Sequence, residues 1–114
     1  MKATDLNCRR FAVVDNESGL SGPATIFEYH TMSGIVTGHY AGGAVAEGRV
    51  VGFMTSSDTM KQLFQSVTVS GELRAGTSEG KIVTDESGRY EINFEWRWLT
   101  SSDGGRSRHV EQSP

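Results

Sequence analysis

The sequence has few of the residues that small secreted or membrane proteins rely on. Cys8 is the only cysteine among 114 residues, so no internal disulfide is possible. Because small secreted domains often need disulfides, we expect a reducing, cytoplasmic location. The N-terminus has no apolar stretch typical of a signal peptide, and no segment approaches the roughly 18 apolar residues of a membrane helix. The sequence therefore predicts a soluble intracellular protein with no membrane partner.

Signals for nucleic acids, metals and phosphate-bearing cofactors are also missing. The net charge of −3 is unlike the basic character typical of nucleic-acid-binding proteins. His30, His39 and His109 have no second histidine or cysteine at a metal-ligand spacing, so we predict no metal site. Gly42-Gly43 is not followed by a helical pattern, which leaves a phosphate-binding loop unsupported. We therefore predict neither cofactor nor nucleic-acid partner.

Helical periodicity is nearly absent, and short β-rich runs recur between glycine and serine clusters. There are fourteen glycines and only two prolines, which favours many tight turns. We expect a loop over residues 15–23 and turns at 33–34, 42–43, 56–58 and 85–88. The predicted strands span residues 11–14, 25–31, 35–41, 45–55, 62–70, 72–77, 81–84, 89–99 and 107–111.

The spacing of these strands predicts an all-β fold. Eight or nine short strands joined by short connections favour an antiparallel up-and-down meander in which sequential strands are neighbours. Closure of the meander removes the unpaired edges that invite aggregation, so we favour a small lipocalin-like or avidin-like barrel over a sandwich. Residues 1–114 are expected to form one domain, with residues 1–23 partly irregular.

The clearest strand, over residues 89–99, has two different faces. Its aromatic and aliphatic face carries Tyr90, Ile92, Phe94, Trp96 and Trp98. Its polar face carries Arg89, Glu91, Asn93, Glu95 and Arg97. The first face is expected to form the core, or to line a ligand cavity near its two tryptophans. The second is expected to be a solvated surface, or to place Glu95 and Arg97 at a barrel mouth or dimer contact.

The strand over residues 45–55 has one face of mostly small side chains. We expect Ala44, Ala46, Gly48, Val50, Gly52 and Met54 to share that face. The opposite face is expected to carry Val45, Glu47, Arg49, Val51 and Phe53. Small residues leave room either for large neighbouring side chains or for a ligand.

Candidate functional residues are dispersed along the chain. His39 and Glu95 are the best candidates for a general base, and Tyr40 for a general acid or hydrogen-bond donor. Each of these three side chains also fits an ordinary structural role. Candidates for ligand binding are Trp96, Trp98 and Phe64, with Arg74 available to hold a polar group.

A set of short motifs carries a family resemblance. The motifs are GHYAGG at 38–43, Gly-Glu-Leu at 71–73 and Glu-Trp-Arg-Trp at 95–98. Their order resembles a family of short, mostly uncharacterised bacterial proteins often labelled N-acetylglutamate synthase, over about residues 26–111. The matching positions are Tyr40, Gly42, Gly43, Gly48, Gly52, Gly71, Glu72, Gly76, Glu95, Trp96 and Trp98. The chain departs from this pattern at residues 64–66, where the resemblance implies an aromatic residue followed by histidine.

Three functions stay open at this point. The first is a β-barrel that binds a small apolar or aromatic molecule. The second is a cofactor-independent isomerase, cyclase or lyase that uses an acid–base pair inside the barrel. The third is an interaction protein that dimerises through a strand edge.

Overall fold

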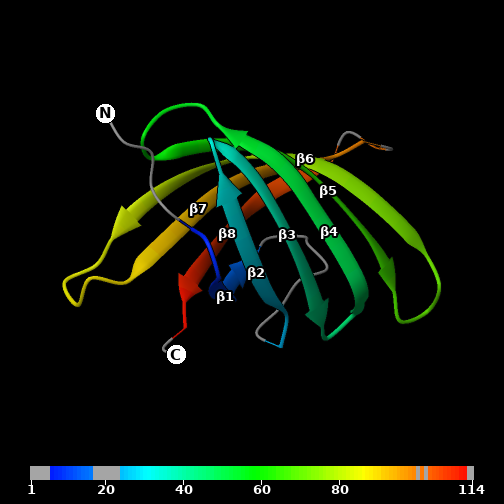
Figure 1. The fold of residues 1–114 in the computed structure, drawn as a ribbon. Coiled ribbons are helices and arrows are strands. Elements are labelled where there is room, and N and C mark those ends of the chain that lie inside the picture. Colours follow the sequence, from blue (N-terminus) through cyan, green and yellow to red (C-terminus); the bar gives the residue numbers. More distant parts are fainter. Residues whose placement is uncertain (1–5, 17–23, 100, 102, 113–114) are drawn as a thin grey trace.

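The chain folds into a closed antiparallel barrel of eight strands (Figure 1). The computed structural model describes residues 6–16, 24–99, 101 and 103–112. Each strand pairs with the next one in the sequence, and β1 also pairs with β8 to close the barrel. The strands are β1 (Arg9–Asn16), β2 (Ile26–Met32), β3 (Ile35–Gly42), β4 (Val45–Met54), β5 (Thr59–Thr68), β6 (Leu73–Thr84), β7 (Tyr90–Trp98) and β8 (Gly104–Glu111).

The predicted all-β meander and its closure are confirmed, and several strand boundaries differ from the prediction. The runs over 72–77 and 81–84 form the single strand β6. This strand continues through Gly80, where an added Cβ would lie 2.6 Å from the ring of Phe94, so glycine marks close packing and not a strand break. β1 reaches Asn16, beyond its predicted end, and β5 already begins at Thr59. Most of the predicted loop, residues 17–23, lies outside the described residues.

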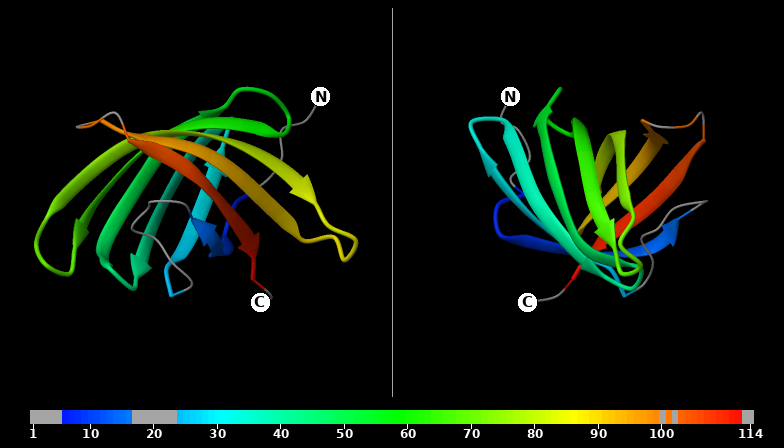
Figure 2. Two further views of the ribbon diagram at one scale, coloured as in Figure 1. Left: turned by 180° about the vertical axis from the view of Figure 1, so that it is seen from behind. Right: turned by 90° about the vertical axis from the view of Figure 1, so that its right-hand side faces the viewer.

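Barrel closure leaves none of the described strands with an unpaired edge. All eight described strands have a hydrogen-bonded neighbour on both sides. Figure 2 shows, from behind and from the side, how the strands wrap around a common interior.

The inner face of the barrel is formed by alternate residues of each strand. On β7, Ile92, Phe94 and Trp96 are buried, which confirms that the aromatic face points inward. On β4, Gly48 and Val50 share the buried face, as the alternation predicts. Val45, which was expected on the opposite face, is buried as well, because a register shift between Val45 and Glu47 reverses the alternation at the start of the strand.

One end of the barrel is filled by a dense apolar core. Its fully buried side chains include Leu6, Phe11, Tyr29, Val36, Met60 and Ile92. The rings of Phe11 and Tyr29 meet edge to face, with centroids 5.6 Å apart. This packing leaves the other end of the interior, near Trp96 and Trp98, as the place where a cavity remains. The described residues form no helix with the length and hydrophobicity needed to span a membrane.

Candidate functional site: a pocket in the barrel interior

A small pocket lies inside the barrel at its tryptophan-rich end. Its volume is about 50 Å³, which is room for a few water-sized groups. Its aromatic lining consists of Phe27, Tyr40, Phe64, Phe94, Trp96 and Trp98. Its polar lining consists of Asn16, Gln62, Ser66, Ser78, Ser107 and His109. None of the described lining residues is an aspartate, glutamate, lysine or arginine, so the pocket is polar without carrying a formal charge.

The two tryptophans and Phe64 form one wall of this pocket. Trp96 is 7 % exposed, and its indole Nε1 donates a hydrogen bond of 3.2 Å to Oδ1 of Asn16. Trp98 meets Trp96 nearly edge to face at 5.1 Å between ring centroids, and meets Phe64 similarly at 5.7 Å. Trp98 is less buried than Trp96. The wall therefore has a fixed inner ring, Trp96, and a more accessible ring, Trp98.

Tyr40 lies on the opposite side of the interior as part of a ring stack. Its ring is nearly parallel to that of Phe27, with centroids 4.3 Å apart. Gly48, opposite Tyr40 on β4, gives the ring room because any Cβ there would overlap it. Burial raises the pKa of Tyr40 above its ordinary value, although the Ser66 side chain opposes the rise. The hydroxyl of Tyr40 is therefore protonated at neutral pH and can donate a hydrogen bond.

His109 is a pocket residue that sequence reasoning missed. It is 4 % exposed and lies between the rings of Phe27 and Phe94, with centroid separations of 4.6 and 4.8 Å. Its Nε2 lies 3.2 Å from Oγ of Ser107. Burial lowers the pKa of His109 to about 3, so the imidazole is neutral at physiological pH. The alternation of β8 places Ser107 and His109 on the same face, and this pattern is the sequence feature from which the burial of His109 could have been predicted.

Several buried polar atoms in the barrel have no hydrogen-bond partner. Within the described residues they are Tyr29 Oη, Gln62 Oε1, Ser78 Oγ and His109 Nδ1. The last three belong to residues that line the pocket. The side chains of Tyr29 and Gln62 interact with each other, so a small rotation can pair these two groups. An unpaired buried polar atom costs about 1–3 kcal/mol, so Ser78 Oγ and His109 Nδ1 mark places where a water molecule or ligand atom gains a hydrogen bond.

The fold brings four of the seven predicted site residues together in the interior pocket. Tyr40, Phe64, Trp96 and Trp98 all line the pocket. Arg74 does not line it, but its guanidinium lies 5.7 Å from the ring centroid of Trp98. The same guanidinium forms an ion pair of 2.9 Å with Glu72. Arg74 is therefore placed beside the outermost pocket residue.

The two proposed general bases lie on the outer face of the barrel. His39 has a 54 % exposed side chain, and its Nε2 is 3.9 Å from Oε2 of Glu28. Glu95 is exposed and lies opposite Glu79 in the β6–β7 register. Because successive residues of a strand point to opposite faces, His39 cannot share a face with Tyr40, nor Glu95 with Trp96. His39 and Glu95 therefore do not join Tyr40 to form an acid–base pair inside the barrel.

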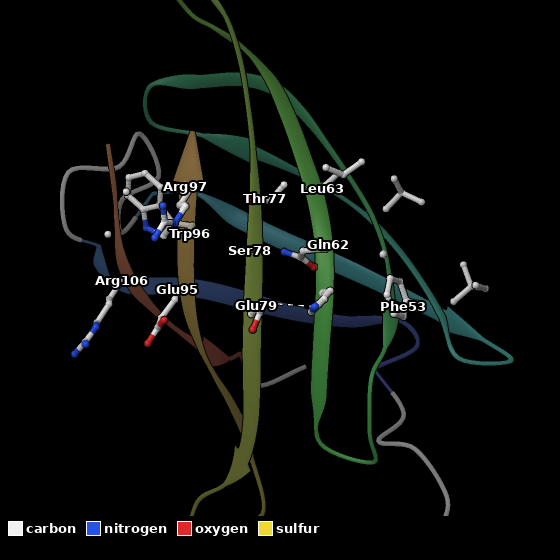
Figure 3. A pocket seen from close by; sticks show the side chains of 16 residues that line it. Phe53, Gln62, Leu63, Thr77, Ser78, Glu79, Glu95, Trp96, Arg97 and Arg106 are labelled. Atoms are coloured by element: carbon white, nitrogen blue, oxygen red, sulfur yellow. Dashed lines mark ion pairs between the residues drawn. The ribbon is translucent and has the colours of Figure 1, made fainter. Parts of the chain in front are cut away.

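A second and larger hollow lies on the outside of the barrel. This groove has a volume of about 1050 Å³ and is open to solvent (Figure 3). Its apolar lining includes Ile35, Val51, Phe53 and Leu63, each about half exposed. Its charged lining consists of Lys61, Glu79, Glu95, Arg97 and Arg106. Lys61 pairs with Glu79 at 3.5 Å. We call this surface the outer groove.

Metal ligands do not assemble in the described part of the chain. No group of three histidine, cysteine, aspartate or glutamate side chains within it is placed to hold a metal ion. Cys8 is exposed, and its Sγ lies 4.0 Å from Nδ1 of His30. The interior pocket, with its aromatic wall and unpaired polar atoms, is therefore the candidate site that the geometry favours.

These features define a class of protein: a small closed antiparallel barrel with a pocket in its interior. A family model described as avidin-like protein matches residues 4–112 of the chain. The chain therefore belongs to the avidin-like family, and avidin-like is one of the two barrel architectures that the sequence predicts. No curated protein and no solved structure gives a match. The label N-acetylglutamate synthase is neither supported nor contradicted by these comparisons.

Proposed function

We propose that this protein binds a small molecule in the interior pocket. The composition of that pocket carries the proposal. Aromatic walls surround unpaired polar atoms, and the pocket lies at the tryptophan-rich end of the barrel, where side chains leave part of the interior empty. Ligand sites combine mostly apolar walls with a few placed polar groups in this way. Because the pocket has room for only a few water-sized groups, a small part of the ligand enters it, and the apolar or aromatic remainder packs against the more accessible rings of Trp98 and Phe64.

The pocket supports binding better than acid–base catalysis. Among the described lining residues, those that titrate are Tyr40 and His109. Burial raises the pKa of Tyr40 and lowers that of His109, so both side chains are neutral at physiological pH. General acid–base catalysis is most efficient when the pKa of the group is near the working pH. Within this lining, the alternative of an isomerase, cyclase or lyase therefore lacks a suitably tuned pair.

Intrinsic tryptophan fluorescence tests the proposal because both tryptophans line the pocket. The protein is titrated with a library of metabolites, and each mixture is then analysed by chromatography coupled to mass spectrometry, which separates isomers as well as compounds of different mass. We expect at least one compound to change the emission and to be recovered with its retention time and mass unchanged. Recovery of a product with a different retention time or mass makes the protein an enzyme. If no compound changes the emission, the binding proposal is wrong.

Replacing Trp98 with alanine is expected to weaken ligand binding by about 30-fold. Removal of a large aromatic anchor from a binding site typically costs about 2 kcal/mol or more. Because Trp98 also packs against Trp96 and Phe64, urea denaturation of the variant is measured in parallel to show that the barrel is still folded under the binding conditions. Isothermal titration calorimetry with a compound found in the fluorescence screen measures the change in affinity.

The matched control for this variant is Leu99→Ala. Leu99 is the next residue along the chain and is 60 % exposed, and it does not line the pocket. We expect its variant to bind like the wild-type protein. Equal affinity of Trp98→Ala and Leu99→Ala would place the ligand elsewhere.

We further propose that two copies of this chain associate through the outer groove. Ile35, Val51, Phe53 and Leu63 form a continuous apolar surface because their strands pair in register: Ile35 lies opposite Phe53, and Val51 opposite Leu63. Clustered apolar side chains on a protein surface commonly mark interaction sites. The neighbouring charges of both signs make the groove electrostatically complementary to a second copy of itself.

Substituting glutamate for Val51 is expected to dissociate this dimer. A charge buried without a partner in an apolar contact is strongly unfavourable, so the dissociation constant should rise at least about tenfold. Light scattering coupled to size-exclusion chromatography gives the mass at a series of concentrations. The control Leu73→Glu adds the same charge at an 81 % exposed residue outside the groove and should leave the mass unchanged. A wild-type protein that stays monomeric at all concentrations would disprove the association.

A further inference from the structure

We infer that the outer groove binds an anionic amphiphile, a small molecule with an apolar body and a carboxylate at one end. This site goes beyond the proposed ligand site in the barrel interior, because the groove lies on the outside of the barrel and has charged side chains in its lining. The groove volume of about 1050 Å³ is at the upper end of the range for small-molecule sites. The order of apolar and charged side chains across the groove defines the ligand.

One row of outward-facing side chains crosses the groove from an apolar end to a cationic end. Val51 lies opposite Leu63 in the register of β4 and β5. Thr77 on β6 lies opposite Leu63 on one side and Arg97 on the other, and Figure 3 shows Leu63, Thr77 and Arg97 in this order. Adjacent strands are about 4.8 Å apart, so Arg97 is about 10 Å from Leu63 and about 14 Å from Val51 along the sheet. A ligand that spans the row has an apolar body of about this length.

The apolar end of the row offers surface that water covers in the single chain. Val51 and Leu63 are each about half exposed, as are Ile35 and Phe53 beside them. Ile35 lies opposite Phe53, so the four side chains form two adjacent rows on the same outer face. Covering them with an apolar body removes that surface from water, which is the main driving force for binding such a body.

Arg97 is the cation best placed to hold the carboxylate. It is exposed and forms no ion pair with another described residue. Its cross-strand neighbours, Thr77 and Gly104, are uncharged, and Gly104 has no side chain that could cover the guanidinium. A guanidinium holds a carboxylate through two parallel hydrogen bonds, and the Thr77 hydroxyl can donate a third.

The other charges of the groove are paired or balanced. Lys61 forms an ion pair with Glu79, and Glu95 lies directly opposite Arg106 in the register of β7 and β8. Three cations and two carboxylates line the groove, which leaves one positive charge in a chain whose net charge is −3. This excess charge is assigned to Arg97, and it makes the groove complementary to an anion and not to a cation.

The amphiphile covers apolar side chains that the proposed contact between two copies also needs. Val51 and Leu63 belong to both the row and that contact. One surface cannot be covered by two partners at once, so binding of the amphiphile favours the single chain over the associated form.

Three compounds with the same ten-carbon chain test the charge of the head. Decanoate is an anion, decan-1-ol is neutral and decyltrimethylammonium is a cation. Each is titrated by calorimetry into wild-type protein that is monomeric by light scattering, below the concentration at which the compound forms micelles. We expect decanoate to bind at least about threefold more tightly than decan-1-ol and at least about tenfold more tightly than the cation.

Variants then locate the head and the body of the ligand. Arg97→Gln is expected to weaken decanoate binding by about threefold to tenfold and to leave decan-1-ol binding unchanged. Leu63→Ala is expected to weaken the binding of both compounds by a similar factor, because it removes apolar contact. The matched control is Arg108→Gln, which removes an arginine from the same outer face of β8 but outside the groove. This control should bind decanoate like the wild-type protein.

The outcomes separate this inference from the interior ligand site. If decan-1-ol or the cation binds as tightly as decanoate, or if none of the three compounds binds, the inference is wrong and the interior site is unaffected. If Arg97→Gln binds decanoate like Arg108→Gln, the inference is also wrong. If Trp98→Ala weakens decanoate binding and Arg97→Gln does not, decanoate enters the interior pocket, which overturns the inference and supports the proposed function.

Light scattering separates the inference from the proposed association. If the wild-type protein forms dimers, saturating decanoate should lower their mass to that of the single chain. Dimers that persist with decanoate bound would show that the ligand lies outside the groove, which contradicts the inference. If the protein is monomeric at all concentrations, the association proposal fails alone, and the calorimetry with Arg97→Gln decides the inference.

Discussion

Replacing His109 with phenylalanine is expected to remove most of the pH dependence of stability between pH 4 and pH 6.5. Burial lowers the pKa of His109 to about 3 in the folded protein, whereas an unfolded histidine has a pKa of about 6.5. Between these two values the unfolded chain binds a proton that the folded chain does not. The free energy of unfolding therefore falls as the pH falls, by about 1.4 kcal/mol per pH unit for one such group.

The cause of this dependence is the closed environment of the imidazole. Phe27 and Phe94 cover its ring, and its cross-strand neighbours are Val13 on β1 and Ile92 on β7. Its one polar contact among the described residues is the neutral hydroxyl of Ser107. No carboxylate is described beside it that would stabilise an imidazolium, so protonation of His109 requires the barrel to open.

Urea denaturation at a series of pH values measures the effect. Asp58 and Asp85 have pKa values lowered below the ordinary carboxyl value by hydrogen bonds, so their contributions fall in a more acidic range. The control Ser107→Ala removes the neutral hydroxyl beside the imidazole and adds or removes no titratable group, so it should keep the pH dependence of the wild-type protein. If the free energy of unfolding falls with pH equally steeply in the wild-type protein and in His109→Phe, His109 is not the buried neutral group that we describe.

Substituting alanine for Gly48 is expected to destabilise the barrel by about 2 kcal/mol. The added Cβ would lie 2.6 Å from Cε1 of Tyr40, which is closer than any real contact allows, so the ring must move. Tyr40 is stacked on Phe27, and movement of one ring disturbs the other. Overpacking of this kind typically costs about 1–3 kcal/mol, more than the gain from replacing glycine in a strand.

The same substitution should also change the pocket, because Tyr40 and Phe27 both line it. Chemical denaturation measures the stability, and the fluorescence titration measures any change in affinity. A suitable control is Ala46→Val, which adds two methyl groups to an exposed residue on the same strand and should cost little. If Gly48→Ala were as stable as the wild-type protein, the close contact between β4 and Tyr40 would be wrong.

The alternation of the strands makes most of the fold predictable. A period of two over residues 89–99 identifies both the strand and its buried face from the amino-acid pattern alone. Short connections and the absence of helical patterns indicate a closed meander, which the structure confirms. The turn at 85–88 is equally clear, since Asp85 accepts hydrogen bonds from the backbone of Ser87 and Arg89.

The features that sequence patterns miss depend on pairing and on local irregularity. The reversal at Val45 comes from a register shift with β5, which no alternation pattern within β4 contains. The continuity of β6 depends on Gly80 fitting under Phe94, a contact between different strands. Both require knowledge of the neighbouring strand, which sequence patterns alone do not supply.

The sequence predicts only part of the candidate site, because the burial of a polar side chain also depends on the neighbouring strands. The aromatic residues Phe64, Trp96 and Trp98 are identified because large apolar side chains in strands have to be buried. His39 and Glu95 were selected for their chemistry, although each is adjacent to an inward-facing residue and must therefore point outward. His109 was overlooked because a single histidine gives no motif, and its burial depends on the closure of β8 against β1.

Two-dimensional NMR of the indole N–H groups tests the central claim most directly. Trp96 and Trp98 give one cross-peak each, and the Trp96 proton is held by Asn16 inside the barrel. On titration with a compound found in the fluorescence screen, we predict saturable shifts of both indole signals and no shift of the exposed His39 ring. A shift confined to residues of the outer face, with both indole signals unmoved, would contradict a ligand site in the barrel interior.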